Sequence, residues 1–167
     1  DSLVRGDLCA EAIRLGRLIA ELMPGEPEAL GLLALMLLHD SRRGARTGPE
    51  GDLVTLEEQD RSRWDQEQIA EGITLIQQAA RMRRPGSYQL QAAIAAVHAE
   101  AEAPEQTDWS DIASLYNELL RLQPTPVVAL NRAVAVAMAV GIDEGLALLD
   151  ELAEQADLEG YYLLDSA

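Results

Sequence analysis

Residues 28–39 read EALGLLALMLLH, and this stretch decides the fold. From Ala29 to Leu38 it contains no polar side chain, so a helix here is apolar on every side. Such a helix is either embedded in a membrane or enclosed by other helices. A bilayer span needs roughly 20 apolar residues, more than this run supplies. We therefore expect a buried central helix in a soluble, all-α protein.

The composition also favours helices. Of the 167 residues, 48% are hydrophobic, mostly Ala and Leu, and there is no Phe. Ala and Leu are strong helix formers, and no stretch of strict apolar–polar alternation predicts a strand. The length suits one domain or one array of repeats. We expect a single helical-repeat domain over 1–167, with N-terminal helices and a long loop in 1–84 and repeats in 85–167.

The charge is strongly acidic and unevenly distributed. The formal net charge is −16, and every basic residue is an Arg. Such a surface repels nucleic acid, whose binding depends on neutralising phosphates. We therefore expect no direct nucleic-acid contact from these residues. Residues 42–84 hold eight Arg and eight acidic residues, so this neutral stretch is the one plausible anion-facing patch.

Sequence features also predict the compartment. Cys9 is the single cysteine, so no internal disulfide can form, which fits a reducing cytoplasm. No signal peptide, membrane span or lipidation motif is evident. The sequence lacks an initiator Met and stops within an apparent helical pattern, GYYLLDSA. We expect a cytoplasmic fragment of a longer protein.

Apolar spacing predicts about eight helices. The first spans about 7–23 and should turn one face inward, and the last begins near Gly160. Between residues 41 and 64 the pattern lapses into a long loop with three Gly and one Pro near its start. An apolar patch in this loop suggests that it is pinned to the body. The expected inward residues of the first helix are Leu8, Ala12, Leu15, Ile19 and Leu22, and the patch is Leu53, Val54 and Leu56.

The later helices resemble one another at a fixed period. Aligning Leu90 with Leu130 matches LQAAIAAV to LNRAVAVA at a shift of forty, and WSDIASLY matches IDEGLALL at a shift of thirty-three. Helical periods in the low thirties are typical of tetratricopeptide repeats. Trp109 fits either the first or the second helix of a repeat. We favour the second, because Pro124 then closes the repeat.

No motif predicts catalysis. His98 and Glu102 have a metal-ligand spacing, but one such pair in an acidic chain is expected by chance. His39 ends the central helix, where a histidine interacts with the helix dipole. No zinc-protease, hydrolase or phosphate-loop motif occurs. We expect a non-enzyme with no catalytic residues, no metal and no cofactor.

Two groups of residues are candidates for binding a partner. In the segment LEEQDRSRWD, an aromatic residue lies among alternating charges directly before a helix cap. It could anchor the loop, form an Arg–Trp binding hot spot, or belong to a solvated charged run. The second group lies on helices expected to line the concave face of a repeat array, or to face solvent. The candidates are Asp60, Arg61, Arg63 and Trp64 in the loop, and Tyr88, Gln91, Asn131 and Arg132 in the groove.

Several blocks together resemble a known family. EALGLLALMLLHDSRR, LEEQDRSRWD, RPGSYQLQAAIAAVHAEA, TDW and PVVALNRAVAVAMAVG are similar to the C-terminal extension of a group of bacterial extracytoplasmic-function (ECF) sigma factors. In that family a tetratricopeptide-like domain follows the two core sigma regions. The resemblance covers nearly the whole chain. It implies that the parent protein directs RNA polymerase to promoters and that the extension regulates it.

The resemblance implies a protein partner: RNA polymerase, the sigma core regions of the same chain, or a regulator. DNA would be read by sigma regions outside this sequence, and no membrane partner is expected. Two alternatives remain open. An Ala-lined groove with Tyr88, Asn131 and Arg132 could sense an anionic metabolite, or the domain could mediate dimerisation.

Overall fold

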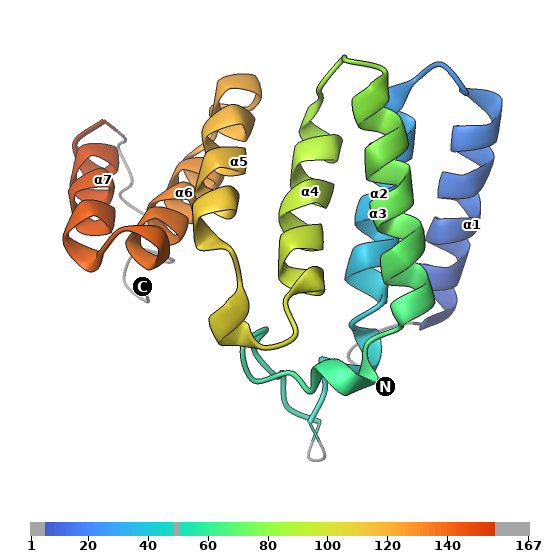
Figure 1. Cartoon of the computed structure of the whole chain (residues 1–167), viewed down its shortest axis with the longest axis horizontal. Helices are drawn as coiled ribbons and strands as arrows, with labels where there is room; N and C mark the ends of the chain where they lie inside the picture. The colour runs from blue at the N-terminus through green and yellow to red at the C-terminus, as the bar shows by residue number, and fades with distance from the viewer. Residues whose placement is uncertain (1–5, 49–50, 156–167) are drawn as a thin grey trace. The chain divides into compact units, whose positions relative to one another are not determined.

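The structure is a computed structural model that describes residues 6–48 and 51–155. Within these ranges it contains seven α-helices and no strand, which confirms the predicted all-α fold (Figure 1). Within α1 to α4 and within α5 to α7, consecutive helices pack against each other as antiparallel hairpins. The eighth helix predicted near Gly160 lies outside the described residues. The helices are α1 (Gly6–Leu22), α2 (Pro27–Asp40), α3 (Gln66–Arg81), α4 (Ser87–Glu100), α5 (Trp109–Leu122), α6 (Pro126–Ala139) and α7 (Ile142–Gln155).

Two compact units divide the chain at residues 108 and 109. The first contains α1 to α4 and the long loop, and the second contains α5 to α7. The sequence grouped α4 with the later repeats, whereas α4 packs against α2 and α3. The expectation that 1–167 is one domain stays a prediction.

Helix α2 is the centre of the first unit. It packs against α1, α3 and α4, as its uninterrupted apolar sequence predicts. Leu37 and Leu38 are each 1% exposed, although they point to different sides of the helix. Leu38 joins the core that α3 and α4 complete, and Leu37 joins Leu33 and Ile13 beneath α1. The prediction of an enclosed core helix is therefore confirmed.

The orientation predicted for α1 is wrong. Leu8, Leu15 and Leu22 are exposed, and Ile13 and Gly16 are buried against α2 instead. The apolar stripe was read correctly from the sequence, but α2 contacts the edge of that stripe. The close approach of α1 to α2 at Gly16 explains why α1 buries a different face from the predicted one. Met36 and Leu33 of α2 lie directly beside this glycine. A stripe of exposed leucines remains on α1.

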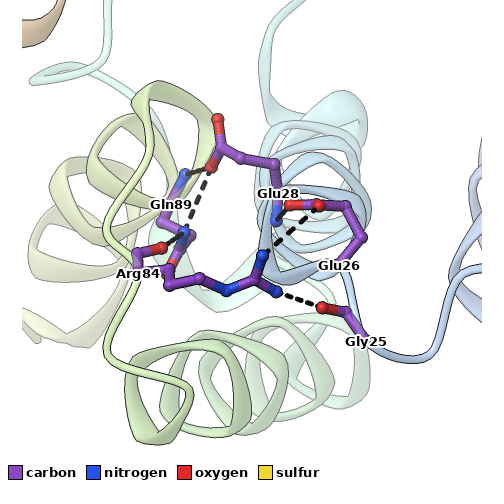
Figure 2. A network of polar contacts seen from close by, with 5 residues as sticks. All are labelled: Gly25, Glu26, Glu28, Arg84 and Gln89. Atoms are coloured by element: carbon purple, nitrogen blue, oxygen red, sulfur yellow. Dashed lines mark hydrogen bonds and ion pairs between the residues drawn. The ribbon is translucent and has the colours of Figure 1, made fainter.

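Two turns of the first unit are joined by polar contacts (Figure 2). The carboxylate of Glu28 accepts hydrogen bonds from the backbone N–H groups of Tyr88 and Gln89, each at 3.0 Å. It therefore caps the N-terminus of α4, whose own N-cap residue Gly86 provides no side chain. Arg84 donates to the carbonyl of Gly25 from the opposite turn. These contacts fix the ends of α2 and α4 to each other.

The start of α3 follows the sequence closely. Asp65 accepts hydrogen bonds from the N–H groups of Glu67 and Gln68, each at 3.0 Å, so it is the predicted N-cap. The Gln68 side chain does not bond back to Asp65, as it would in a capping box, and its amide donates to Asp40 on α2 at 3.2 Å. The Asp65 N–H donates instead to the Ser41 carbonyl, which ties the start of α3 to the end of α2.

The second unit repeats the hairpin plan on a smaller scale. Helix α6 packs against both α5 and α7. Thr125 caps α6 by accepting from the Val128 N–H, with Pro126 in the first turn. Ile112 and Leu119 of α5 are buried, whereas Leu122 is exposed at the end of α5. Among the described residues, no helix is both long enough and apolar enough to cross a membrane.

Helix α2 approaches α4 closely at Gly31. A Cβ atom there would lie 2.7 Å from the backbone N of Gln89, which is a steric clash. We predict that Gly31→Ala lowers the free energy of unfolding by roughly 1–3 kcal/mol through overpacking. Helix propensity alone would favour Ala by about 1 kcal/mol, so a loss must come from this contact. Urea denaturation measures the change.

Gly25→Ala is the matched control, because no atom lies within 4 Å of a Cβ at Gly25. We expect this control to change stability by less than about 0.5 kcal/mol. Stabilisation by Gly31→Ala would show that α2 and α4 are not this close.

Candidate interaction site

The long loop is folded onto the first unit rather than extended from it. After Ser41 it forms a 3₁₀ turn (Arg43–Ala45), an isolated bridge between Thr47 and Leu53, and a second 3₁₀ turn (Arg61–Arg63). Leu56 packs against the main core, and Leu53 is 70% exposed. The prediction of a pinned loop is confirmed, although Leu53 takes no part in it.

Trp64 is the anchor of this loop. Its side chain is 4% exposed and lies in one core cluster with Leu38 and Ala96. The guanidinium of Arg61 lies 4.7 Å from the ring centroid, and that of Arg42 lies 5.9 Å from it. Both distances are in the range of cation–π attraction. Of the alternatives raised by the sequence, the geometry corresponds to loop anchoring.

Arg61 also caps the C-terminal end of α4. Its Nη1 group donates to the carbonyl oxygens of His98 and Ala101, each at 2.6 Å. Carbonyls at the end of a helix lack helical N–H partners and carry partial negative charge, so a guanidinium is stabilising there. Arg61 therefore connects the loop, the indole and α4.

The other two loop candidates are exposed. Asp60 accepts hydrogen bonds from the N–H and hydroxyl groups of Ser62 at 3.0 and 2.6 Å, so it caps the second 3₁₀ turn. The Ser62 hydrogen bonds also lower the pKa of Asp60. Arg63 is exposed beside it. Of the four loop candidates, Asp60 and Arg63 are thus the two that a partner could contact directly.

The two arginines beside this anchor belong to a larger basic cluster. We define the basic cluster as His39, Arg42, Arg46, Arg61 and His98. Arg42 and Arg46 both donate to Nδ1 of His39, at 2.9 and 3.2 Å. Desolvation, followed by the charge of Arg42, lowers the pKa of both histidines to about 4. At neutral pH each ring is therefore uncharged, and Nδ1 of His39 can act as an acceptor.

The arginines of the cluster repel one another. Burial lowers the pKa of Arg42 to about 10, and the neighbouring charges of Arg46 and Arg61 contribute. In the part of the chain that the structure describes, none of these three forms an ion pair with a carboxylate. The sequence indicated an anion-facing stretch over residues 42–84 but not this cluster. The spacing of His39, Arg42 and Arg46, on successive turns of one segment, was the available signal.

The groove candidates lie in different units. Tyr88 is exposed and Gln91 half-buried on α4 in the first unit. Asn131 is exposed and Arg132 half-buried on α6 in the second unit, where Arg132 donates to Asn117 on α5 at 2.5 Å. Arg132 also lines an open depression between α5 and α6. A common concave surface for all four residues stays a prediction.

The structure shows the surroundings of His98, whose spacing to Glu102 is that of a metal-ligand pair. Across residues 6–48 and 51–155, no group of three or more His, Cys, Asp or Glu side chains is arranged to hold a metal ion. His98 is half-buried and belongs to the basic cluster, with arginines as its charged neighbours.

The lowered pKa values of His39 and His98 predict that the folded protein loses stability in acid. Their pKa is about 4 in the folded state against 6.5 as the ordinary value, so below pH 6.5 the unfolded chain binds more protons. Folding stability therefore falls as the pH drops from about 6.5 to about 4. We predict a smaller fall in Tm across this window for the double variant His39→Gln/His98→Gln than for the native chain. Thermal unfolding followed by circular dichroism at several pH values tests this.

Carboxylates also titrate in this window, so the native and variant profiles must be compared directly. Parallel profiles would contradict the assignment of neutral histidines.

Arg61 provides a second prediction. Arg61→Met removes the cap of α4 and the contact with Trp64, and we expect a loss of roughly 1–3 kcal/mol together with altered tryptophan fluorescence. The control Arg63→Met removes an exposed arginine from the same turn and should have an effect within about 0.5 kcal/mol. Chemical denaturation with fluorescence detection measures both. Equal effects would show that Arg61 has no special structural role.

Comparison with known proteins finds a family model and a relative to which parts of this chain are similar. Residues 1–80 match the family described as "Family of unknown function (DUF6596)". The chain is 55% identical over 159 residues to an uncharacterized protein of Rhizobium meliloti (strain 1021), with 95% of this chain and 37% of the relative aligned. The chain thus spans little more than a third of that relative's length. No solved structure matches the chain. The family match includes α1, α2 and the whole loop, so the loop candidates and most of the basic cluster lie within it.

Proposed function

We propose that this chain is a non-catalytic, cytoplasmic regulatory domain of an ECF-type RNA polymerase sigma factor, and that it acts by binding protein. The residue blocks that resemble the C-terminal extension of such factors carry this proposal. The fold is compatible with it, because arrays of helical hairpins commonly serve as binding scaffolds. A fold alone hosts many functions, so the residue blocks are the stronger argument.

The charge favours a protein partner over nucleic acid. A net charge of −16 opposes contact with a phosphate backbone. Promoter recognition would therefore be left to sigma regions outside this sequence. RNA polymerase, those sigma regions and a separate regulator are the candidate partners. Asp60 and Arg63 are exposed on a loop that is anchored by the buried Trp64, and a pre-ordered loop loses less conformational entropy on binding than a free one.

A metabolite-sensing role is the second candidate. The sequence suggested an anion-binding groove that includes Arg132 on α6. The first unit contains a different candidate site, an apolar cavity with arginines at its edge. Dimerisation is a third candidate, because leucines of α1 are exposed.

Deletion of residues 1–167 from the longer protein tests the leading proposal. We predict that the deletion changes either the set of proteins retained in a pull-down with purified RNA polymerase or the transcription from the target promoter. Arg63→Glu should reproduce part of the effect, and Arg81→Glu, on an exposed arginine outside the loop, should not. A deletion that alters neither the partners nor the promoter output would refute the regulatory role.

A further inference from the structure

A small apolar cavity opens between the start of α1, the end of α2 and the first 3₁₀ turn. Its volume is about 140 Å³, close to that of a cavity able to hold a benzene molecule. One wall is apolar, and the other carries charged groups. The lining residues are Cys9, Ala12, Ile13 and Met36 on the apolar side, and His39, Asp40, Arg43 and Arg46 on the polar side.

The polar side is positively charged in an otherwise acidic protein. Arg43 is engaged with Asp40, its Nη1 lying 3.4 Å from Oδ1, and with the carbonyl of Gly6. Arg46 uses Nη2 for His39, and its Nε and Nη1 groups donate to no described residue. Arg42 adds a further positive charge behind His39. With His39 neutral, the three arginines exceed the one carboxylate by two charges.

The described residues that line the cavity do not cancel this excess. Among them Asp40 is the single acidic residue, and its Oδ2 accepts from the Gln68 amide at 3.2 Å. The repulsion between Arg42 and Arg46 would be reduced by an anion beside Arg46. A guanidinium with free N–H groups is suited to the bidentate binding of a carboxylate.

We propose that this cavity binds a small organic carboxylate whose compact apolar body fills the space beside Ala12 and Met36 and whose carboxylate pairs with Arg46. Ligand pockets of this kind combine an apolar lining with a few polar groups that fix orientation. The size of the cavity limits the apolar body to about that of a benzene ring. The proposal rests on the first unit alone and does not depend on the sigma-factor assignment.

Cys9 supplies a site-specific readout, because it lines the cavity and is the single cysteine of the chain. The full chain is titrated with sodium benzoate and sodium butyrate while the rate of Cys9 alkylation by iodoacetamide is measured at constant ionic strength. Benzamide and butyramide serve as neutral probes of the same shape, and inorganic phosphate as an anion without an apolar body. We expect saturable protection of Cys9 and a rise in Tm with the carboxylates alone.

Two variants and one control locate the effect. Arg46→Gln should weaken carboxylate binding by roughly tenfold or more, because a charge-assisted pair is lost. Ala12→Leu should abolish protection by filling the cavity, with circular dichroism confirming that the variant is folded. Arg81→Gln removes the same charge from an exposed position on α3 and should leave binding unchanged.

Three results would overturn the proposal. The first is the absence of saturable protection with either carboxylate. The second is equal protection by the amides or by phosphate, since either would show that the site does not require both an apolar body and a carboxylate. The third is unchanged binding in Arg46→Gln, which by itself excludes the assigned pair even if Ala12→Leu fails to fold. Each result concerns the cavity alone, so the sigma-factor proposal would be unaffected.

Discussion

The enclosure of α2 is the constraint on which the first unit depends. A helix without a polar face cannot remain at a surface, so three other helices must surround it. Small residues make this possible. Gly31 allows the approach of α4, and Gly72 of α3 lies against Leu38, where a Cβ atom would be 2.9 Å from Cγ. The apolar sequence determines that α2 is buried, and the glycines determine how closely its neighbours pack.

Apolar packing alone leaves the helices free to slide, and polar groups fix their ends. Helix α4 shows this most clearly, because neither of its ends is satisfied by its own side chains. Glu28 of α2 binds the N–H groups at its start, and Arg61 of the loop binds the carbonyls at its end. Charge-assisted hydrogen bonds of this type are stronger than neutral ones. The loop is therefore part of the scaffold and not an appendage.

Much of this architecture could be predicted from local sequence. Helix boundaries were predicted to within a few residues, because Pro, Gly and a capping residue such as Asp65 act locally. The face that α1 buries could not be predicted in the same way. Periodicity identifies an apolar stripe, but it does not say which edge of the stripe meets the neighbouring helix. The shape of the neighbour decides that, here through Gly16.

The candidate site was harder to predict for a related reason. The sequence showed Trp64 among charges, and it left open whether the indole was buried or available to a partner. Burial depends on Leu38 and Ala96, which are distant in the sequence. In the same way, nothing local indicates that Arg61 reaches the carbonyl of His98. Contacts between segments that are far apart in the sequence are the hardest to predict from a single sequence.

The basic cluster shows how an acidic protein can maintain a local positive potential. Ion pairs would neutralise Arg42 and Arg46, but their hydrogen-bond acceptor is an uncharged imidazole. Because His39 accepts without contributing negative charge, both guanidinium groups are held in place without being neutralised. The cluster also includes Arg61, which stacks on Trp64 and caps α4. The basic cluster therefore also contains the contacts that anchor the loop.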